Sequence, residues 1–279
     1  MIPDALSAYG WPDGTSVTPG PRGALGQIWQ VDTGAARYAL KEIFAEPPSE
    51  ERIRTELDFV ARTGVRAPAG HPDLAGRYLH TTQDGTWLRL YDWVDLRPAP
   101  LSPDLLGALF ARLHKRAPAA EPPVASWYER PPGTHPDLES LAEPSDPARL
   151  VLCHRDLHPE NVLADAAGDL VVVDWDNLGP ADPARELAMA LFDWFPGDPD
   201  ARAALYRAYV RAGGPARITA PADFTMLVSC RLNFLREQAQ VAADQDADPR
   251  HRAWAERELA EMLPLLPTAA ELAETLSLL

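Results

Sequence analysis

Three side chains near the middle of the chain have the types and spacing needed to handle a phosphate and a hydroxyl. Asp156 and Asn161 lie in the run C-H-R-D-L-H-P-E-N-V-L, which spans residues 153–163. Asp174 follows in V-V-V-D-W-D at 171–176. Phosphoryl transfer needs a carboxylate that orients the attacking hydroxyl and accepts its proton, and oxygen ligands that hold magnesium on the phosphates. The sequence therefore predicts phosphoryl-transfer chemistry at these residues.

Short apolar segments flank this loop. Leu150–Leu152 precede it and Leu170–Val173 follow it, and both have the composition of buried strands. Catalytic groups are commonly carried on loops that a rigid scaffold positions. A single aspartate in a loop is more often a capping residue, but an Asp–Asn–Asp set between two strands favours a catalytic interpretation.

These segments resemble the catalytic loop and metal-binding segment of protein kinases and, more closely, of the aminoglycoside phosphotransferase family. The D-W-D at 174–176 is similar to the phosphotransferase form and differs from the D-F-G of protein kinases. Leu113-His114 and the run D-P-A-R-E-L-A at 182–188 also resemble that family. The family usually has glycine at the position of Arg155, so the contacts of Arg155 are left open, as is the role of His158.

The resemblance implies a bilobal protein-kinase-like fold and a role for each matching residue. Asp156 would be the catalytic carboxylate, and Asn161 and Asp174 would be magnesium ligands. The phosphate donor would be ATP, with Mg²⁺ as the metal. A pseudokinase that binds nucleotide without chemistry is a different class of answer, and the intact Lys41, Asp156, Asn161 and Asp174 set argues against it.

A lysine in an otherwise apolar strand is a candidate for contact with the nucleotide. Lys41 lies in the predicted strand Tyr38–Phe44, and a lysine that faces inward needs a partner. Glu56 lies beside the apolar stripe of the following predicted helix. The expected Lys41–Glu56 ion pair would position the lysine on the ATP phosphates. The alternative is that both side chains face solvent.

Two further groups of residues complete the expected nucleotide site. Gly23 and Gly26 precede a predicted strand without forming a full G-x-G-x-x-G, so a turn and a phosphate-binding loop are both open readings. The resemblance also implies an interlobe hinge at 91–94, where the backbone of Asp92 and Val94 would read the adenine edge.

The elements that must position these residues change in type along the chain. Strands and a single helix dominate the predicted nucleotide-binding lobe, 1–95, and helices dominate the predicted lobe 96–279, which would carry the catalytic loop and substrate cleft. This is an α+β layout. Ser49 and Gly64 would cap the helix of the first lobe. The first lobe is expected to contain two hairpins, Gly26–Asp32 with Ala36–Phe44 and Arg77–Thr82 with Thr86–Val94.

The second lobe is expected to begin with a helix that Ser102-Pro103 opens and that runs to Arg116. Its predicted buried residues are Leu105, Leu106, Leu109, Phe110 and Leu113. Further helices are expected over Ala184–Phe195, Asp200–Ala212, Ala222–Ala243 and Arg250–Leu263.

Composition restricts the class of partner. The formal net charge of −15 makes nucleic acid an unlikely ligand class, because binding needs clustered Lys and Arg against phosphates. The two cysteines fit neither a disulfide framework nor a zinc site. The absence of an apolar run long enough for a membrane span, and of a signal segment, predicts a cytoplasmic protein with no membrane partner. The oligomeric state is open.

The acidic charge, together with the resemblance, predicts a cationic small-molecule substrate. An aminoglycoside or basic peptide antibiotic is the first expectation, with resistance by inactivation as the result. Metabolites of the choline, homoserine or fructosamine type are the alternative. Asp193 and Glu237 in the predicted helices are candidates for contact with a substrate ammonium group, although a solvated helix face is the favoured explanation for each of them.

Overall fold

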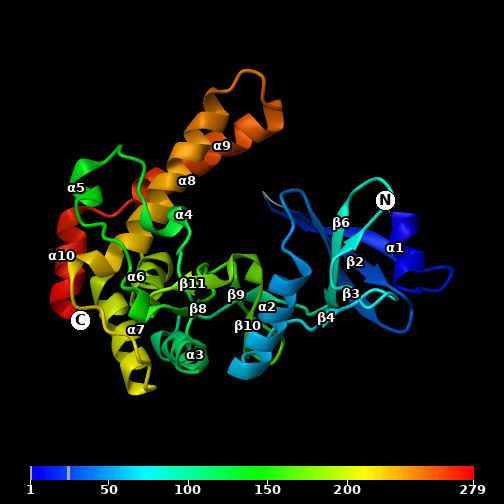
Figure 1. Cartoon of the computed structure of the whole chain (residues 1–279), viewed down its shortest axis with the longest axis horizontal. Helices are drawn as coiled ribbons and strands as arrows, with labels where there is room; N and C mark the ends of the chain where they lie inside the picture. The colour runs from blue at the N-terminus through cyan, green and yellow to red at the C-terminus, as the bar shows by residue number, and fades with distance from the viewer. Residues whose placement is uncertain (1, 24–25) are drawn as a thin grey trace. The chain divides into compact units, whose positions relative to one another are not determined.

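The computed structural model describes residues 2–23 and 26–279, and its contacts divide the chain into two units (Figure 1). The first unit contains Met1–Ala99 and Val162–Asp176, and the second contains Pro100–Asn161 and Asn177–Leu279. The expected lobes divided the chain once, at residues 95 and 96. The contacts assign the segment that carries Asp174 to the first unit, and the predicted boundary between lobes stays a prediction.

A six-stranded antiparallel sheet forms most of the first unit. Its strand order is β1-β2-β3-β6-β4, and β5 also pairs with β6. The two predicted hairpins are confirmed, the second with shorter strands than expected. The strands are β1 (Ser16–Arg22), β2 (Gly26–Asp32), β3 (Arg37–Ile43), β4 (Gly70–His71), β5 (His80–Thr81) and β6 (Trp87–Asp92).

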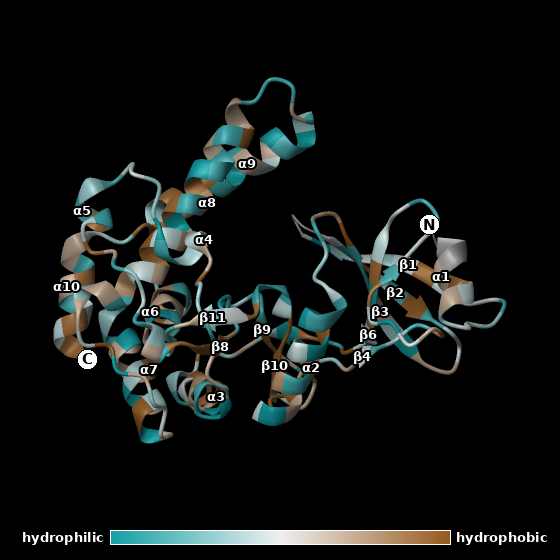
Figure 2. Cartoon of the chain, viewed as in Figure 1, coloured by the Kyte–Doolittle hydropathy of each residue, from teal (hydrophilic) through white to brown (hydrophobic). Residues whose placement is uncertain are grey.

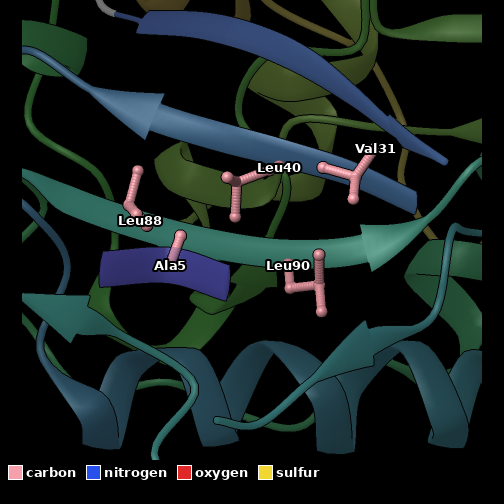
Figure 3. Close-up of a cluster of buried hydrophobic side chains, with 5 residues drawn as sticks. All are labelled: Ala5, Val31, Leu40, Leu88 and Leu90. Atoms are coloured by element: carbon pink, nitrogen blue, oxygen red, sulfur yellow. The ribbon is translucent and has the colours of Figure 1, made fainter. Parts of the chain in front are cut away.

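The two faces of this sheet carry different kinds of side chain. Leu40 lies opposite Leu90 in the β3–β6 register, and both are buried with Val31, Leu88 and Ala5 of helix α1 (Ile2–Ala8) (Figure 3). Successive side chains of a strand point to opposite faces. Lys41 and Arg89, which also lie opposite each other, therefore project from the other face of the sheet.

Helix α2 (Glu50–Thr63) has the predicted caps. The hydroxyl of Ser49 accepts a hydrogen bond from the backbone N–H of Arg52, and Gly64 ends the helix at φ 64°. A left-handed residue at this position is a common helix end, and glycine adopts it without a steric penalty. A second sheet completes the first unit, with the order β10-β9-β7, where β7 is Arg97–Pro98, β9 is Val162–Ala164 and β10 is Leu170–Val172.

Helices form most of the second unit, as predicted. Helix α3 packs closely on α7, since a Cβ at Gly107 would lie 2.6 Å from the backbone nitrogen of Tyr209. Leu105 is 48% exposed, so its predicted burial on α3 is wrong, although the other four predicted apolar positions are buried. The helices are α3 (Pro103–Arg116), α4 (Ser126–Glu129), α5 (Pro136–Glu139), α6 (Pro183–Trp194), α7 (Pro199–Arg211), α8 (Thr225–Ala243), α9 (Pro249–Met262) and α10 (Ala269–Leu278).

Helix α6 is buried along almost its whole length, whereas α9 buries Ala255 alone among its residues. Figure 2 shows the corresponding hydrophilic colouring of α9. The strands β8 (Val151–Cys153) and β11 (Gly179–Ala181) pair antiparallel beside the predicted catalytic loop. Short 3₁₀ turns lie at η1 (Pro147–Arg149), η2 (Trp175–Asn177), η3 (Pro221–Phe224) and η4 (Leu263–Leu265). The predicted α+β class is confirmed. Among the described residues, every helix is too short or too polar to cross a bilayer.

Candidate active site

The loop after β8 holds the Asp156 carboxylate in place through two side-chain amides. Oδ2 of Asp156 accepts a hydrogen bond from Nδ2 of Asn161 at 2.9 Å and another from Nδ2 of Asn177 at 3.2 Å. The indole of Trp194 on α6 fixes the loop by donating to the carbonyl of Leu157 at 2.8 Å. Asp156 is therefore presented from a loop that its own hydrogen bonds hold rigid.

Asp156 is also poised to remain ionised. Burial alone would raise the pKa of Asp156, but hydrogen bonding and the charge of His158, together with the Asn177 amide, lower it below its usual value. Nε2 of His158 lies 3.5 Å from Oδ1 of Asp156. Burial would lower the pKa of His158, and the neighbouring Asp156 raises it overall. The role of His158, left open by the sequence, thus includes electrostatic support of the carboxylate.

Asn161 is oriented in a way that suits a metal ligand. Its Nδ2 donates to the backbone carbonyl of Asp156 at 3.1 Å as well as to the carboxylate. With the nitrogen directed at Asp156, the amide oxygen is the atom that remains to face a cation. Amide oxygens and carboxylates are the ligands that Mg²⁺ prefers.

In the first unit, Lys41 binds the two carboxylates of the D-W-D segment. Nζ of Lys41 lies 2.9 Å from Asp174 and 2.6 Å from Asp176. Burial alone would lower the pKa of Lys41, but these two charges raise it above its usual value. Asp174 follows β10 at φ 55° and its side chain is 45% exposed. An exposed carboxylate beside a protonated lysine fits a site for a metal-bound phosphate.

The predicted Lys41–Glu56 ion pair is wrong, because a different cation occupies the glutamate. Nη2 of Arg89 bonds both carboxylate oxygens of Glu56, at 3.0 and 2.8 Å, while its Nη1 bonds Asp176 at 3.0 Å. Both side chains of the Arg89–Glu56 pair are less than a tenth exposed. Arg89 thus lies between Glu56 and Asp176, and Asp176 in turn holds Lys41.

The D-W-D segment is fastened to the first unit by its tryptophan and its backbone. The ring of Trp175 packs against Phe59 of α2 at 5.8 Å, and its indole donates to the carbonyl of Val172. Arg52 of α2 donates to the carbonyl of Asp176 at 2.9 Å. Helix α2 therefore positions the segment through these contacts as well as through Glu56.

Gly23 follows β1 and Gly26 begins β2, and both have structural roles that the sequence left open. A Cβ at Gly26 would lie 2.5 Å from the carbonyl oxygen of Glu42, so the pairing of β2 with β3 requires glycine there. The N–H of Gly23 donates to the carbonyl of Gly26 at 3.0 Å. The described residues thus account for Gly26 by sheet packing, and phosphate contact at Gly23 and Gly26 stays a prediction.

The predicted hinge begins where β6 ends. Asp92 closes the strand, with its N–H on the carbonyl of Ala69 at 2.9 Å and its carboxylate 2.6 Å from His71. Val94 lies in the irregular segment that follows and is half-buried. A role for this backbone in adenine recognition stays a prediction.

The two predicted substrate carboxylates differ in their surroundings. Asp193 on α6 is half-buried and bonds Nη2 of Arg231 at 2.9 Å. Burial raises the pKa of Asp193 despite that arginine. Glu237 is exposed on α8. A substrate ammonium group would have to compete with Arg231 for Asp193, while Glu237 is accessible.

Sequence reasoning missed three residues that bond predicted site residues within their own units: Arg89 and Asp176 in the first unit, and Asn177 in the second. Arg89 is a charged residue between two leucines, directly opposite Lys41 in the sheet register, and that alternation was a usable signal. Asp176 belonged to the motif but had no assigned role. Nothing in the spacing of Asn177 indicated its bond to Asp156.

Comparison with solved structures finds proteins of similar fold. A spectinomycin phosphotransferase, solved with ADP and spectinomycin, has a TM-score of 0.65 at 14% identity, covering 98% of this chain and 95% of its own. A microcompartment-associated aminopropanol kinase has a TM-score of 0.69 at 18% identity, covering 99% and 98%. A choline/ethanolamine kinase family protein from Mesorhizobium loti has a TM-score of 0.60 at 19% identity, covering 98% and 95%.

These structures share the fold predicted for this chain. A comparison with curated protein sequences finds no significant match. The model of the phosphotransferase enzyme family matches residues 16–224, which include Lys41, Asp156, Asn161 and Asp174. That match confirms the predicted enzyme class, a phosphotransferase. The chain belongs to the phosphotransferase enzyme family.

Proposed function

We propose that this protein is an ATP- and Mg²⁺-dependent O-phosphotransferase that acts on a hydroxyl of a cationic small molecule, in the first place an antibiotic. The observation that carries the proposal is the Asp156 carboxylate, held ionised between the amides of Asn161 and Asn177. A fixed carboxylate in this state suits the orientation of a hydroxyl and the acceptance of its proton.

The reaction assigned to these residues is a transfer of the γ-phosphoryl group. The hydroxyl oxygen of the acceptor forms the new P–O bond, the bond to ADP breaks, and Asp156 takes the hydroxyl proton. Lys41 offsets phosphate charge, and Asp174 and Asn161 are the residues that would hold Mg²⁺. The metal would supply further neutralisation of the phosphate charge. Positioning and electrostatics account for most of the acceleration in such transfers.

Two observations support a cationic acceptor. The chain has a formal net charge of −15, and a surface of one sign concentrates ligands of the opposite sign. Proteins of similar fold include a spectinomycin phosphotransferase, an aminopropanol kinase and a choline kinase. Inactivation of an antibiotic in the cytoplasm would then give resistance.

A metabolite kinase is the second candidate. It is favoured by the aminopropanol kinase, whose TM-score of 0.69 exceeds the 0.65 of the spectinomycin phosphotransferase. Small amino alcohols and aminoglycoside-type compounds share an ammonium group and a hydroxyl, so the same carboxylates suit both.

An ATP-consumption screen separates these candidates. Purified protein is incubated with Mg-ATP and spectinomycin, amicoumacin, choline, ethanolamine or aminopropanol, and ADP and the phosphorylated acceptor are measured. We expect product with at least one antibiotic-type cation. A preference for an amino alcohol would support the metabolite kinase, and absence of Asp156-dependent ADP formation with any acceptor and with water would contradict the phosphotransferase activity itself.

A further inference from the structure

Arg155 occupies a backbone position that suits glycine. Its φ is 68°, in the left-handed region that a side chain with a Cβ disfavours and that glycine occupies freely. An arginine persists in such a conformation when the surrounding structure stabilises it. The contacts of its side chain therefore point to a role that glycine cannot fill.

The Arg155 side chain is buried against three neighbours of the second unit. Nε donates to the backbone carbonyl of Asn177 at 2.6 Å. The guanidinium group lies over the ring of Tyr128, 4.2 Å from its centroid. It also covers Gly179, where any Cβ would collide with its Nη2 atom. Arg155 is only 7% exposed, so these contacts are shielded from solvent.

Tyr128 and Asn177, the two polar neighbours of Arg155, are connected to Asp156 by hydrogen bonds. The hydroxyl of Tyr128 donates to Oδ1 of Asn177 at 3.1 Å. With its oxygen held in this way, the Asn177 amide must turn its Nδ2 group the other way, and that group donates to Oδ2 of Asp156 at 3.2 Å. Arg155 fixes the Asn177 backbone, and Tyr128 fixes the Asn177 side chain.

We propose that Arg155 is a positioning residue that sets the orientation of the Asp156 carboxylate through Tyr128 and Asn177. The inference rests on the proposed function, because it takes Asp156 as the catalytic carboxylate. If Arg155 were merely structural, its loss would destabilise the second unit as a whole. The Asn177–Asp156 hydrogen bond would then be affected no more than other contacts.

The asparagines of this chain allow a direct test. The sequence has three: Asn161, Asn177 and Asn233. Selective ¹⁵N labelling of asparagine therefore gives three side-chain amide signals, two from groups bonded to Asp156 and one from a group bonded to the carbonyls of Trp127 and Arg130. Asn233 thus serves as an internal reference beside α4.

Arg155→Gly removes the side chain without imposing backbone strain. We expect exchange of the Asn177 amide protons with water to speed up by about fivefold, the effect of losing one ordinary hydrogen bond, while exchange at Asn233 stays the same. Gly179→Ala, which keeps Arg155 but displaces its guanidinium group, should have the same effect. Arg207→Ala removes an exposed arginine elsewhere in the same unit and should leave all three signals unchanged.

The second readout is phosphate release from Mg-ATP with water as the acceptor, after subtraction of the Asp156→Asn rate. Arg155→Gly should lower this rate about tenfold, since small misplacements of a catalytic group are costly, while the KM for ATP and the melting temperature stay unchanged. Unchanged Asn177 exchange would overturn the proposal. A lower melting temperature together with weaker nucleotide binding and a lower rate would also overturn the proposal, because that combination indicates a structural role. A wild-type protein without Asp156-dependent release would contradict the proposed function, and the amide exchange would still decide the role of Arg155.

Discussion

Lys41 and Arg89 face each other across β3 and β6, and this register decides which carboxylate each of them meets. Arg89 takes Glu56 and one side of Asp176, and Lys41 takes Asp174 and the other side of Asp176. Burial raises the pKa of Glu56 even beside Arg89. Burial also opposes the charged form of Arg89, but the neighbouring acidic groups raise the pKa of Arg89 overall. We call Glu56, Arg89, Asp176, Lys41 and Asp174 the charge network. Removal of any one of its members would leave a neighbouring charge without one of its partners.

A double-mutant cycle tests the Arg89–Glu56 pair. Arg89→Met and Glu56→Gln should each lower the free energy of unfolding by about 3 kcal/mol, because each leaves a buried polar group without its partner. The double variant should lose clearly less than the sum, as measured by urea unfolding. The exposed Arg37–Asp95 pair is the control, and its cycle should give a much smaller coupling, because solvent screens the two charges. Additive losses at Arg89 and Glu56 would contradict the pairing.

Asp174 is the accessible end of the charge network. In Asp174→Ala, the strengthening of ATP binding by Mg²⁺ should fall by about tenfold or more, because a carboxylate ligand of the metal is lost. Calorimetric titration with ATP, with and without Mg²⁺, measures this. Asp169→Ala removes an exposed carboxylate of the same unit and should keep the wild-type magnesium dependence. Equal dependence in Asp174→Ala would remove Asp174 from the metal site.

At the scale of elements, caps and alternation predicted most of the fold. Ser49 and Gly64 bound α2, and Ser102 begins α3, where the sequence placed them. Strand β1 was missed because Pro19 and Pro21 argue against a strand. It is an edge strand that pairs with β2 alone, and an edge tolerates proline.

Helix α10 was missed although its signal was present. Thr268 and Glu271 form a capping box, with the hydroxyl of Thr268 accepting from the N–H of Glu271 and the Glu271 carboxylate accepting from the N–H of Thr268. The site was predictable where a motif carried it, as at Asp156 and Asn161. It was not predictable where tertiary packing chose the partner, as in the bonds of Glu56 to Arg89 and of Asn177 to Asp156.

The loop between β4 and β5 depends on one carboxylate. Asp73 is 5% exposed and accepts hydrogen bonds from the backbone of Ala75 and Arg77 and from the Arg77 side chain, with His80 3.1 Å away. Burial alone would raise the pKa of Asp73, and these bonds lower it to about 2 from 3.8. The ionised form is thus favoured in the folded state, by about 2 kcal/mol.

This contribution should be present above pH 3.8 and disappear as the pH falls through about 2, since the folded-state pKa is the lower one. Asp73→Asn should lose about 2 kcal/mol at pH 7 and show a shallower fall of stability on acidification. Urea unfolding from pH 7 to pH 2.5 measures both. Asp58→Asn, at an exposed position of α2, is the control and should leave the stability at pH 7 unchanged. A wild-type slope in Asp73→Asn would contradict the role of Asp73.

For the whole molecule, the family membership and the fold are shown, and the substrate is the open variable. The similar structures include a spectinomycin phosphotransferase and a choline/ethanolamine kinase family protein at identities of 14% and 19%. One fold therefore accommodates different acceptors, and contact of Glu237 or of the Asp193–Arg231 pair with an acceptor stays a prediction.

The net charge gives a prediction at this scale. The KM for a cationic acceptor should rise several-fold between low and high salt, with a smaller change in kcat, because salt screens the attraction over a Debye length of about 8 Å at physiological ionic strength. Steady-state kinetics in about 20–500 mM potassium chloride measures this, because the Debye length shortens over that range of salt. A neutral alcohol acceptor is the control. If the best acceptor were uncharged or anionic and its KM indifferent to salt, the cationic-substrate proposal would be wrong.

The central claim is that Asp156 carries phosphoryl transfer, and Asp156→Asn tests it most directly. The variant keeps the shape of the side chain and removes its charge. With Mg-ATP and the best acceptor from the screen, kcat should fall by about 10³-fold or more, while the Kd for Mg-ATP changes by about threefold or less and the melting temperature is retained. Near wild-type turnover by the folded variant would contradict the claim.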